Sequence, residues 1–154
     1  MATQTFSVEI NHESIKRKVQ NGTFKFGKAR ETDSNSKLTN NVKATDIASD
    51  DDILTDSLER HICMIIIDFS KYFPQRVTTE QGKSKVDTIT FTLPGEWENA
   101  NGAGFKADIH DYLINAVMYD FLALSLPKEA EFYQQKALVS LQGAERKLFY
   151  KRAV

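Results

Sequence analysis

Apolar side chains recur at spacings of three and four residues in three separate stretches of this 154-residue chain. That period places the apolar side chains of each stretch on one face of an α-helix, and each face must pack against another element. We therefore expect helices near residues 50–73, 105–126 and 128–150. Pro74 ends the first helix. Pro127 separates the other two, which we expect to form an antiparallel helical hairpin.

A β-hairpin is expected between the first two helices, at about residues 76–93. Residues 77–79 and 86–93 are rich in β-branched side chains, and most of the second run alternates between apolar and polar residues. A polar turn that contains Gly82 joins the two runs. The expected fold class is therefore mainly α (α+β): a three-helix core with an inserted β-hairpin and an extended N-terminal arm.

The arm is expected to comprise residues 1–45, with residues 46–154 forming the helical domain. Residues 31–45 contain only three apolar side chains, which is typical of a flexible connector. The alternative is an arm that orders only against a partner. Because the N-terminal unit is too small to form its own core, we expect it to pack on the main body or on a neighbouring subunit. Deleting it should then leave the helical body folded.

Three short elements are expected within the arm. The alternation from Phe6 to Ile10 predicts a half-buried strand. Asn11 is a candidate cap for a short helix around residues 13–19, which Asn21-Gly22 would end. A second alternating run, at residues 23–27, predicts another strand.

Charge is distributed unevenly, although the formal net charge is −1. Residues 1–45 carry eight Lys and Arg against four acidic residues, a net of +4, whereas residues 46–75 carry two against seven, a net of −5. The overall balance argues against a general nucleic-acid coat. Basic residues interleave with Phe24 and Phe26, which leaves two alternatives. The segment either contacts DNA or forms a solvated face or a surface for an acidic protein.

The chain offers little for catalysis. It contains no GxSxG, GxxxxGK[ST] or GxGxxG motif, so the hydrolase and nucleotide-loop interpretations have no support. Cys63 lies in an apolar helical run, where we expect a buried, unreactive thiol. Asp108, His110 and Asp111 fall near a helix start, where acids are stabilised by the helix dipole, and a metal would need a further ligand. We expect no enzymatic activity, no cofactor and no metal site.

A membrane location is not expected either. The longest unbroken apolar run, residues 62–67, is far shorter than the roughly 20 residues that span a bilayer. The N-terminus lacks the basic and apolar regions of a secretory signal. The single cysteine excludes a disulfide framework and a cysteine-based zinc site.

Three features of the C-terminal two thirds of the chain form a familiar pattern. Thr88–Pro94 leads into the Trp97 loop, the next expected helix contains Tyr112–Leu122, and the helix after Pro127 contains Glu129-Ala130, Tyr133 and Ala137. On this pattern, about residues 50–152 resemble the small head–tail connector (neck ring) proteins of tailed bacteriophages, especially phages and prophages of Bacteroides-type hosts. The resemblance implies a structural protein of the virion, made in the host cytoplasm.

The resemblance also implies the partners. Many copies would form a homo-oligomeric ring beneath the portal, joining the capsid to the tail around the DNA channel. The expected partners are the portal protein and tail or other neck proteins, with passive contact to DNA in the channel. The alternative function is a small monomeric or dimeric prophage adaptor or regulatory protein that binds another protein.

In a ring, the basic arm of one subunit would lie near the acidic helix start of the next, at Asp50 and Asp51. Exposed ion pairs contribute only about 0–1 kcal/mol, so Phe24 and Phe26 should hold the arm by burial. Asp120 lies among apolar residues and needs a cationic partner from a neighbouring element or subunit. We therefore expect five candidate inter-subunit contacts: Phe24, Phe26, Asp50, Asp51 and Asp120.

Overall fold

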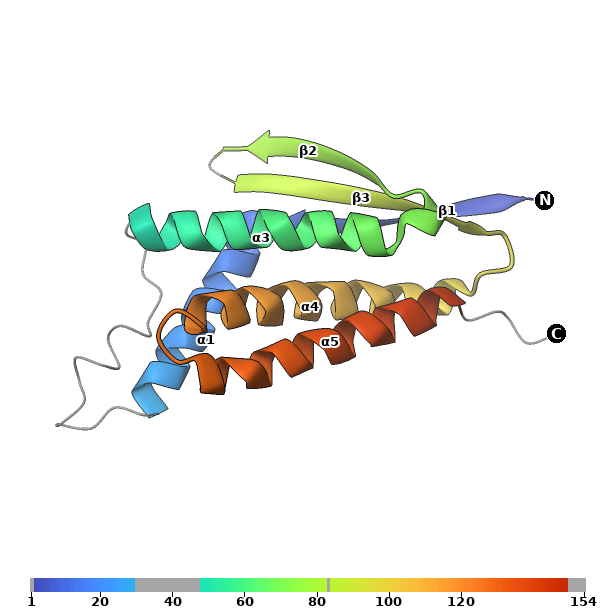
Figure 1. Ribbon diagram of the computed structural model, residues 1–154. Helices are drawn as coiled ribbons and strands as arrows, with labels where there is room; N and C mark the ends of the chain where they lie inside the picture. The colour runs from blue at the N-terminus through green and yellow to red at the C-terminus, as the bar shows by residue number, and fades with distance from the viewer. Residues whose placement is uncertain (1, 30–47, 83, 150–154) are drawn as a thin grey trace.

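The computed structural model describes residues 2–29, 48–82 and 84–149, and Figure 1 shows a small sheet lying over the long helices. The expected mainly α (α+β) class is confirmed. The elements follow in the order β1 (Thr3–Asn11), α1 (His12–Ala29), α3 (Ala48–Asp68), the 3-10 turn η1 (Ser70–Tyr72), β2 (Gln75–Gln81), β3 (Ser84–Pro94), the 3-10 turn η2 (Asn99–Asn101), α4 (Gly102–Leu122) and α5 (Pro127–Phe149).

The sheet is antiparallel, with β3 in the centre of the order β1-β3-β2. The expected hairpin is present: β2 pairs with β3 from Gln75↔Thr90 to Gln81↔Ser84. Alternation along β3 puts threonines on the open face and buries the intervening side chains against the helices. The buried set from the two longer strands is Val8, Ile10, Asp87, Ile89, Phe91 and Leu93.

Residues 2–29 do not form an extended arm, and the expectation that this unit packs on the main body is confirmed for them. β1 pairs with β3 along its whole length, from Thr3↔Pro94 to Asn11↔Val86, and so completes the sheet. Its inward side chains, Val8 and Ile10, are buried, as are Ile15 and Val19 of α1. The boundary therefore does not separate an arm from a body, because this segment supplies part of the common core. The expected linker, residues 31–45, lies outside the described residues.

The internal layout of this segment also differs from expectation. The cap at Asn11 is confirmed, since the Ser14 N–H donates to Asn11 Oδ1 at 3.1 Å. The expected stop at Asn21-Gly22 and the strand at 23–27 are wrong, because α1 continues to Ala29. Gly22 has a packing reason: a Cβ there would lie 3.1 Å from Met118 Sδ of α4. The glycine lets α1 pass close to α4 without ending the helix.

α4 is the central helix and packs against α1, α3 and α5. Its buried side chains point in several directions, whereas α5 buries only one face. The helical hairpin expected around Pro127 is confirmed. Three small residues spaced seven apart, Ala130, Ala137 and Ala144, are buried along the seam and let α5 approach α4 closely. In Figure 1, α5 lies farthest from the sheet.

Aromatic rings join the layers at one end of the molecule. Phe69, Phe91 and Phe105 come from the end of α3, from β3 and from α4, and their ring centroids lie 5.3 to 5.9 Å apart in edge-to-face arrangements. Trp97 is buried in the loop after β3 and donates from Nε1 to the Lys147 carbonyl at 2.9 Å. Among the described residues, no helix is both long enough and apolar enough to cross a bilayer.

Candidate functional site

Asp87, on the inner face of β3, is a fully buried carboxylate. The guanidinium of Arg76 in β2 donates to both carboxylate oxygens, with Nε 2.9 Å from Oδ1 and Nη2 2.8 Å from Oδ2. His12, at the start of α1, places Nε2 2.5 Å from Oδ2, and the Thr78 hydroxyl donates to Oδ1. Burial alone would raise the pKa of Asp87, but these hydrogen bonds outweigh it and lower the pKa to about 2.

Arg76 extends this network to α3. Its Nη2 lies 2.7 Å from Glu59 Oε2, so one guanidinium bridges two carboxylates on different elements. The hydrogen bond from Arg76 lowers the pKa of Glu59, and the two carboxylates together raise the pKa of Arg76. We refer to His12, Glu59, Arg76, Thr78 and Asp87 as the Asp87 cluster. It ties the sheet to α1 and α3.

The Asp87 cluster contains a set of side chains that could ligate a metal ion. Donor atoms of His12, Glu59 and Asp87 lie within 4.8 Å of one another. The Arg76 guanidinium already contacts both carboxylates, so a divalent ion would have to displace a cation held by four short contacts. The Arg76 guanidinium therefore already provides the positive charge between these carboxylates. The Asp87 cluster is a structural ion-pair network.

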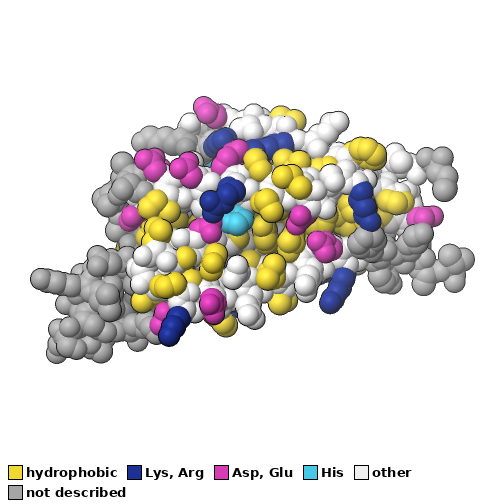
Figure 2. Space-filling view, in the orientation of Figure 1, with side chains coloured by type: hydrophobic (Ala, Val, Ile, Leu, Met, Phe, Trp, Pro, Cys, Tyr) yellow, Lys and Arg dark blue, Asp and Glu magenta, His cyan; other side chains and the backbone are white. Residues whose placement is uncertain are grey.

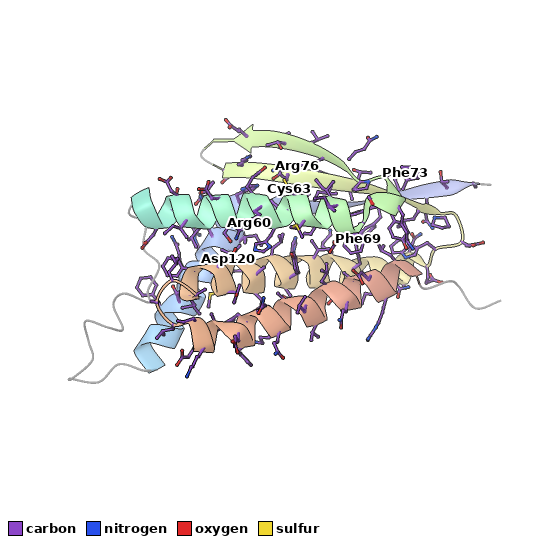
Figure 3. All side chains as sticks on the ribbon, in the orientation of Figure 1. Arg60, Cys63, Phe69, Phe73, Arg76 and Asp120 are labelled. Atoms are coloured by element: carbon purple, nitrogen blue, oxygen red, sulfur yellow. The ribbon has the colours of Figure 1, made fainter. Side chains whose placement is uncertain are left out.

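A second polar cluster joins α3 to α4 at Asp120 (Figure 3). Ser57 Oγ donates to Asp120 Oδ2 at 2.6 Å, His61 Nε2 lies 2.8 Å from the same oxygen, and Arg60 also contacts it. Burial would raise the pKa of Asp120, but the bonds from His61 and Ser57 outweigh it and lower the pKa. The cationic partner expected for Asp120 therefore comes from the same chain.

The residue types Ser57, His61 and Asp120 are those of a hydrolytic triad, but their connections are different. In a triad the serine hydroxyl meets a histidine nitrogen, which acts as its base. Here the Ser57 hydroxyl donates to the aspartate, and the second His61 nitrogen, Nδ1, lies 3.2 Å from the Tyr112 hydroxyl. Ser57 is also buried. The Ser57 hydroxyl therefore has no histidine base, and the hydroxyl that His61 meets is that of Tyr112.

The other candidate contacts from the sequence are placed as follows. Asp51 Oδ1 lies 2.9 Å from Lys16 Nζ, so this acidic residue meets the basic segment within one chain. Asp50 is half-buried in the first turn of α3. Phe24 is 43% exposed on α1, and the side chain of Phe26 lies outside the described residues. Of the described candidates, Asp51 and Asp120 contact cationic side chains of the same chain, and Phe24 presents a large apolar surface.

The cluster at Asp108–Asp111 is not brought together around one point. Asp108 contacts Lys147 of α5, whereas His110 Nε2 lies 2.8 Å from the Glu9 carbonyl of β1. Asp111 is exposed. Asp108 and His110 therefore brace α4 against two different neighbours.

An exposed apolar stripe on α3 was not expected from the sequence. The apolar run around Cys63 predicts that this thiol is buried. Instead Cys63 is exposed, Met64 is 43% exposed and Ile67 is 64% exposed. The opposite face, with Ile62, Ile65 and Phe69, already fills the space against the other layers. We refer to the exposed Cys63, Met64 and Ile67 of α3, together with the exposed Phe73 that follows η1, as the α3 stripe.

Phe73 has the least common conformation in the stripe. Its backbone lies in the left-handed region at φ 51° and ψ 54°, directly before Pro74. This region costs a residue with a Cβ about 1–2 kcal/mol, and the ring is nevertheless 71% exposed (Figure 3). Strain of this kind is concentrated at functional positions. The fold thus holds an aromatic ring in solvent at the junction of η1 and β2.

A second exposed apolar stripe lies on α5. Phe132 and Val139 are seven residues apart, so they share one helix face, and they are 60% and 68% exposed. Leu138 is exposed beside them. We refer to Phe132, Leu138 and Val139 as the α5 stripe. In Figure 2, hydrophobic side chains lie between the charged side chains on the face formed by α3 and the helices beneath it.

Comparisons of the chain with protein families, curated proteins and solved structures found no match.

The position of Cys63 can be checked chemically. An exposed thiol should react stoichiometrically with a disulfide reagent in the folded protein, within minutes and without denaturant. Cys63→Ala, the matched blank, should show no reaction and should retain the melting temperature of the parent. A thiol that reacts only after unfolding would show that this side of α3 is covered.

Proposed function

We propose that this chain is a non-enzymatic structural subunit that assembles into a ring, as a head–tail connector (neck) protein of a tailed bacteriophage. The observation that carries the proposal is the pair of exposed apolar stripes on two different helices, α3 and α5. In this proposal the ring joins the portal to tail or other neck proteins in the virion and surrounds the DNA channel.

The two stripes suit a ring because of its symmetry. A ring is built from heterologous contacts, in which one surface of a subunit meets a different surface of the next. Such a subunit needs two complementary surfaces on one molecule, whereas a two-fold dimer uses one surface twice. The α3 stripe and the α5 stripe supply two apolar surfaces, and clusters of exposed apolar side chains mark protein interaction sites.

The polar clusters support a structural role. In both the Asp87 cluster and the Asp120 cluster, the central carboxylate is occupied by donors from other elements of the same chain. In neither cluster does a serine or threonine hydroxyl meet a histidine nitrogen, because Ser57 and Thr78 both donate to the central aspartate. Their effect is to fix the helices and the sheet relative to one another, so that the stripes are presented on a rigid body.

A complementation experiment tests this function. One double variant, Ile67→Glu with Phe73→Glu, disables the α3 stripe, and another, Phe132→Glu with Val139→Glu, disables the α5 stripe. We expect the parent chain to form discrete oligomers by light scattering, alone or on purified portal protein. Each double variant should remain monomeric, and an equimolar mixture should give a heterodimer, because one intact stripe of each kind is left.

Thr79→Glu, on the open face of the sheet, is the control and should assemble like the parent. Normal assembly of the α5 variant beside a monomeric α3 variant would indicate a two-fold contact and favour the dimeric adaptor. A parent chain that stays monomeric at every concentration and also with portal protein would contradict the ring.

A further inference from the structure

A pocket of about 310 Å³ opens between the end of β1, the start of α1 and the first half of α4. None of its lining residues comes from α3 or α5, so it has no part in the contacts proposed above. Most of the residues that line it are polar: Glu9, Asn11, Ser14, Lys18, Lys106 and His110. Its volume is at the lower end of the range for small-molecule sites in proteins.

Two lysines in this wall are not neutralised. Among the described residues, neither Lys18 nor Lys106 has a carboxylate within ion-pair distance. Other lysines of the chain are paired, for example Lys16 with Asp51 and Lys147 with Asp108. Two lysines from different helices therefore bring their charges to one concave surface, and no carboxylate of the described residues pairs with either.

The start of α1 adds neutral donors to the same wall. Asn11 Oδ1 accepts the Ser14 N–H at 3.1 Å, which leaves the Asn11 side-chain nitrogen to donate elsewhere. The Ser14 hydroxyl also lines the pocket. The N-terminal end of an 18-residue helix carries a partial positive charge, which favours an anion at this position.

We propose that this pocket binds a phosphate group. Lysine acts on phosphate as a compact point charge, whereas a planar carboxylate is usually recognised by the two-pronged guanidinium of arginine. Among the described residues, no arginine lines the pocket. The phosphate belongs either to a small phosphate compound or to the backbone of a nucleic acid, because both present the same tetrahedral oxyanion.

His110 and Glu9 define the geometry of the site. A carbonyl oxygen can only accept, so His110 donates from Nε2 to the Glu9 carbonyl at 2.8 Å and holds α4 against β1. Lys106 lies four residues before His110 and therefore projects from the same face of α4. Glu9 is the one acidic residue among the described residues that line the pocket, so its charge should weaken the binding of an anion.

The test is a titration of the full chain with inorganic phosphate, followed by amide chemical shifts at constant ionic strength with chloride as the balancing anion. We expect saturable shifts confined to the segments around residues 9–18 and 104–110. Lys18→Gln and Lys106→Gln should each weaken binding about fivefold, and Glu9→Gln should strengthen it by a similar factor. Lys128→Gln, an exposed lysine on α5 outside the pocket, should leave the affinity unchanged.

The direction in which each variant changes the affinity for phosphate distinguishes a specific site from general attraction of the anion to a basic surface. Equal losses in Lys18→Gln and Lys128→Gln, or shifts that never saturate, would overturn the proposal. An unchanged affinity in both pocket lysine variants would do the same. Competition then identifies the source: displacement of phosphate by a short DNA duplex assigns it to a nucleic-acid backbone, and displacement by adenosine monophosphate alone assigns it to a small compound. The oligomerisation experiment can fail without affecting any of these results.

Discussion

Deleting residues 2–29 is expected to abolish cooperative folding of the whole chain. Four apolar side chains in this segment are buried in the common core: Val8, Ile10, Ile15 and Val19. Burying a side chain of this size contributes about 1.5–3 kcal/mol, so the four together contribute roughly 6–12 kcal/mol. The entire stability of a domain is about 5–15 kcal/mol. The deletion also leaves β3 with an unpaired edge and exposes Ile89 and Phe91.

Thermal and urea denaturation followed by circular dichroism measure this effect. The deleted chain should show no cooperative transition, and a matched pair of point variants on β1 should show why. Ile10→Ala, at a buried position, should cost about 2–5 kcal/mol, while Thr5→Ala, on the exposed face of the same strand, should change stability by less than about 0.5 kcal/mol. A deleted chain that melts cooperatively would restore the interpretation of this segment as a separable arm.

Local patterns predicted most elements of this fold but not the role of its first segment. The spacing of apolar residues located α3, α4 and α5, and the β-branched runs located the hairpin. Alternation at Phe6–Ile10 also indicated a strand correctly. Its partner, however, is Asp87–Phe91, about eighty residues further along the chain. Nothing in a local pattern identifies a partner at that distance, so a core strand was interpreted as part of an arm.

Periodicity also shows that a helix has an apolar face without showing how many of its faces are covered. On α3 and in the turn after it, Ile62, Ile65 and Phe69 are buried as expected, but Met64 and Ile67 are equally apolar and exposed. Only the number of packed neighbours distinguishes the two sets, and that number is a property of the whole fold. The exposed stripe on α3 therefore could not be separated from the core by reading the sequence.

The Asp87 cluster did leave a signal in the sequence. Alternation along β3 puts Asp87 on the same side as Ile89 and Phe91, where a carboxylate requires a partner. The hairpin register then places Thr78 directly opposite and Arg76 next along the same face. His12 and Glu59 could not be found in this way, because they come from helices whose positions against the sheet depend on tertiary packing.

Replacing Asp87 with asparagine is expected to cost about 3–5 kcal/mol at neutral pH. The change keeps the side-chain shape but removes the charge that Arg76 and His12 face, and an ion pair that loses one buried partner leaves the other uncompensated. For a chain of this length the melting temperature should fall by roughly 6–20 °C. Asp111→Asn, the same substitution at an exposed position, should change stability by less than about 0.5 kcal/mol.

The pH dependence of that difference provides the sharper measurement. Asp87 has a pKa of about 2 in the folded chain and about 3.8 as an ordinary aspartate, so the folded state favours the charged form. A lowered pKa contributes stability above the ordinary value, here about 2 kcal/mol, and that contribution is lost as the pH falls from about 4 to about 2. In the Asp87→Asn variant the side-chain amide does not titrate in this range, so the variant lacks this contribution at every pH.

Urea unfolding of the parent and of Asp87→Asn at several pH values should therefore show two curves that converge as the pH falls through this window. Asp120 also has a lowered pKa and keeps its partners in both chains, so its acid loss cancels in the comparison. The charge of Asp87 raises the pKa of Glu59, so that pKa should fall further in the variant. Curves that stay parallel from neutral pH down to about pH 2 would mean that the Asp87 carboxylate gains nothing from Arg76, Thr78 and His12 in the folded state. The sheet would then be held to α1 and α3 by apolar packing and by the pairing of Arg76 with Glu59.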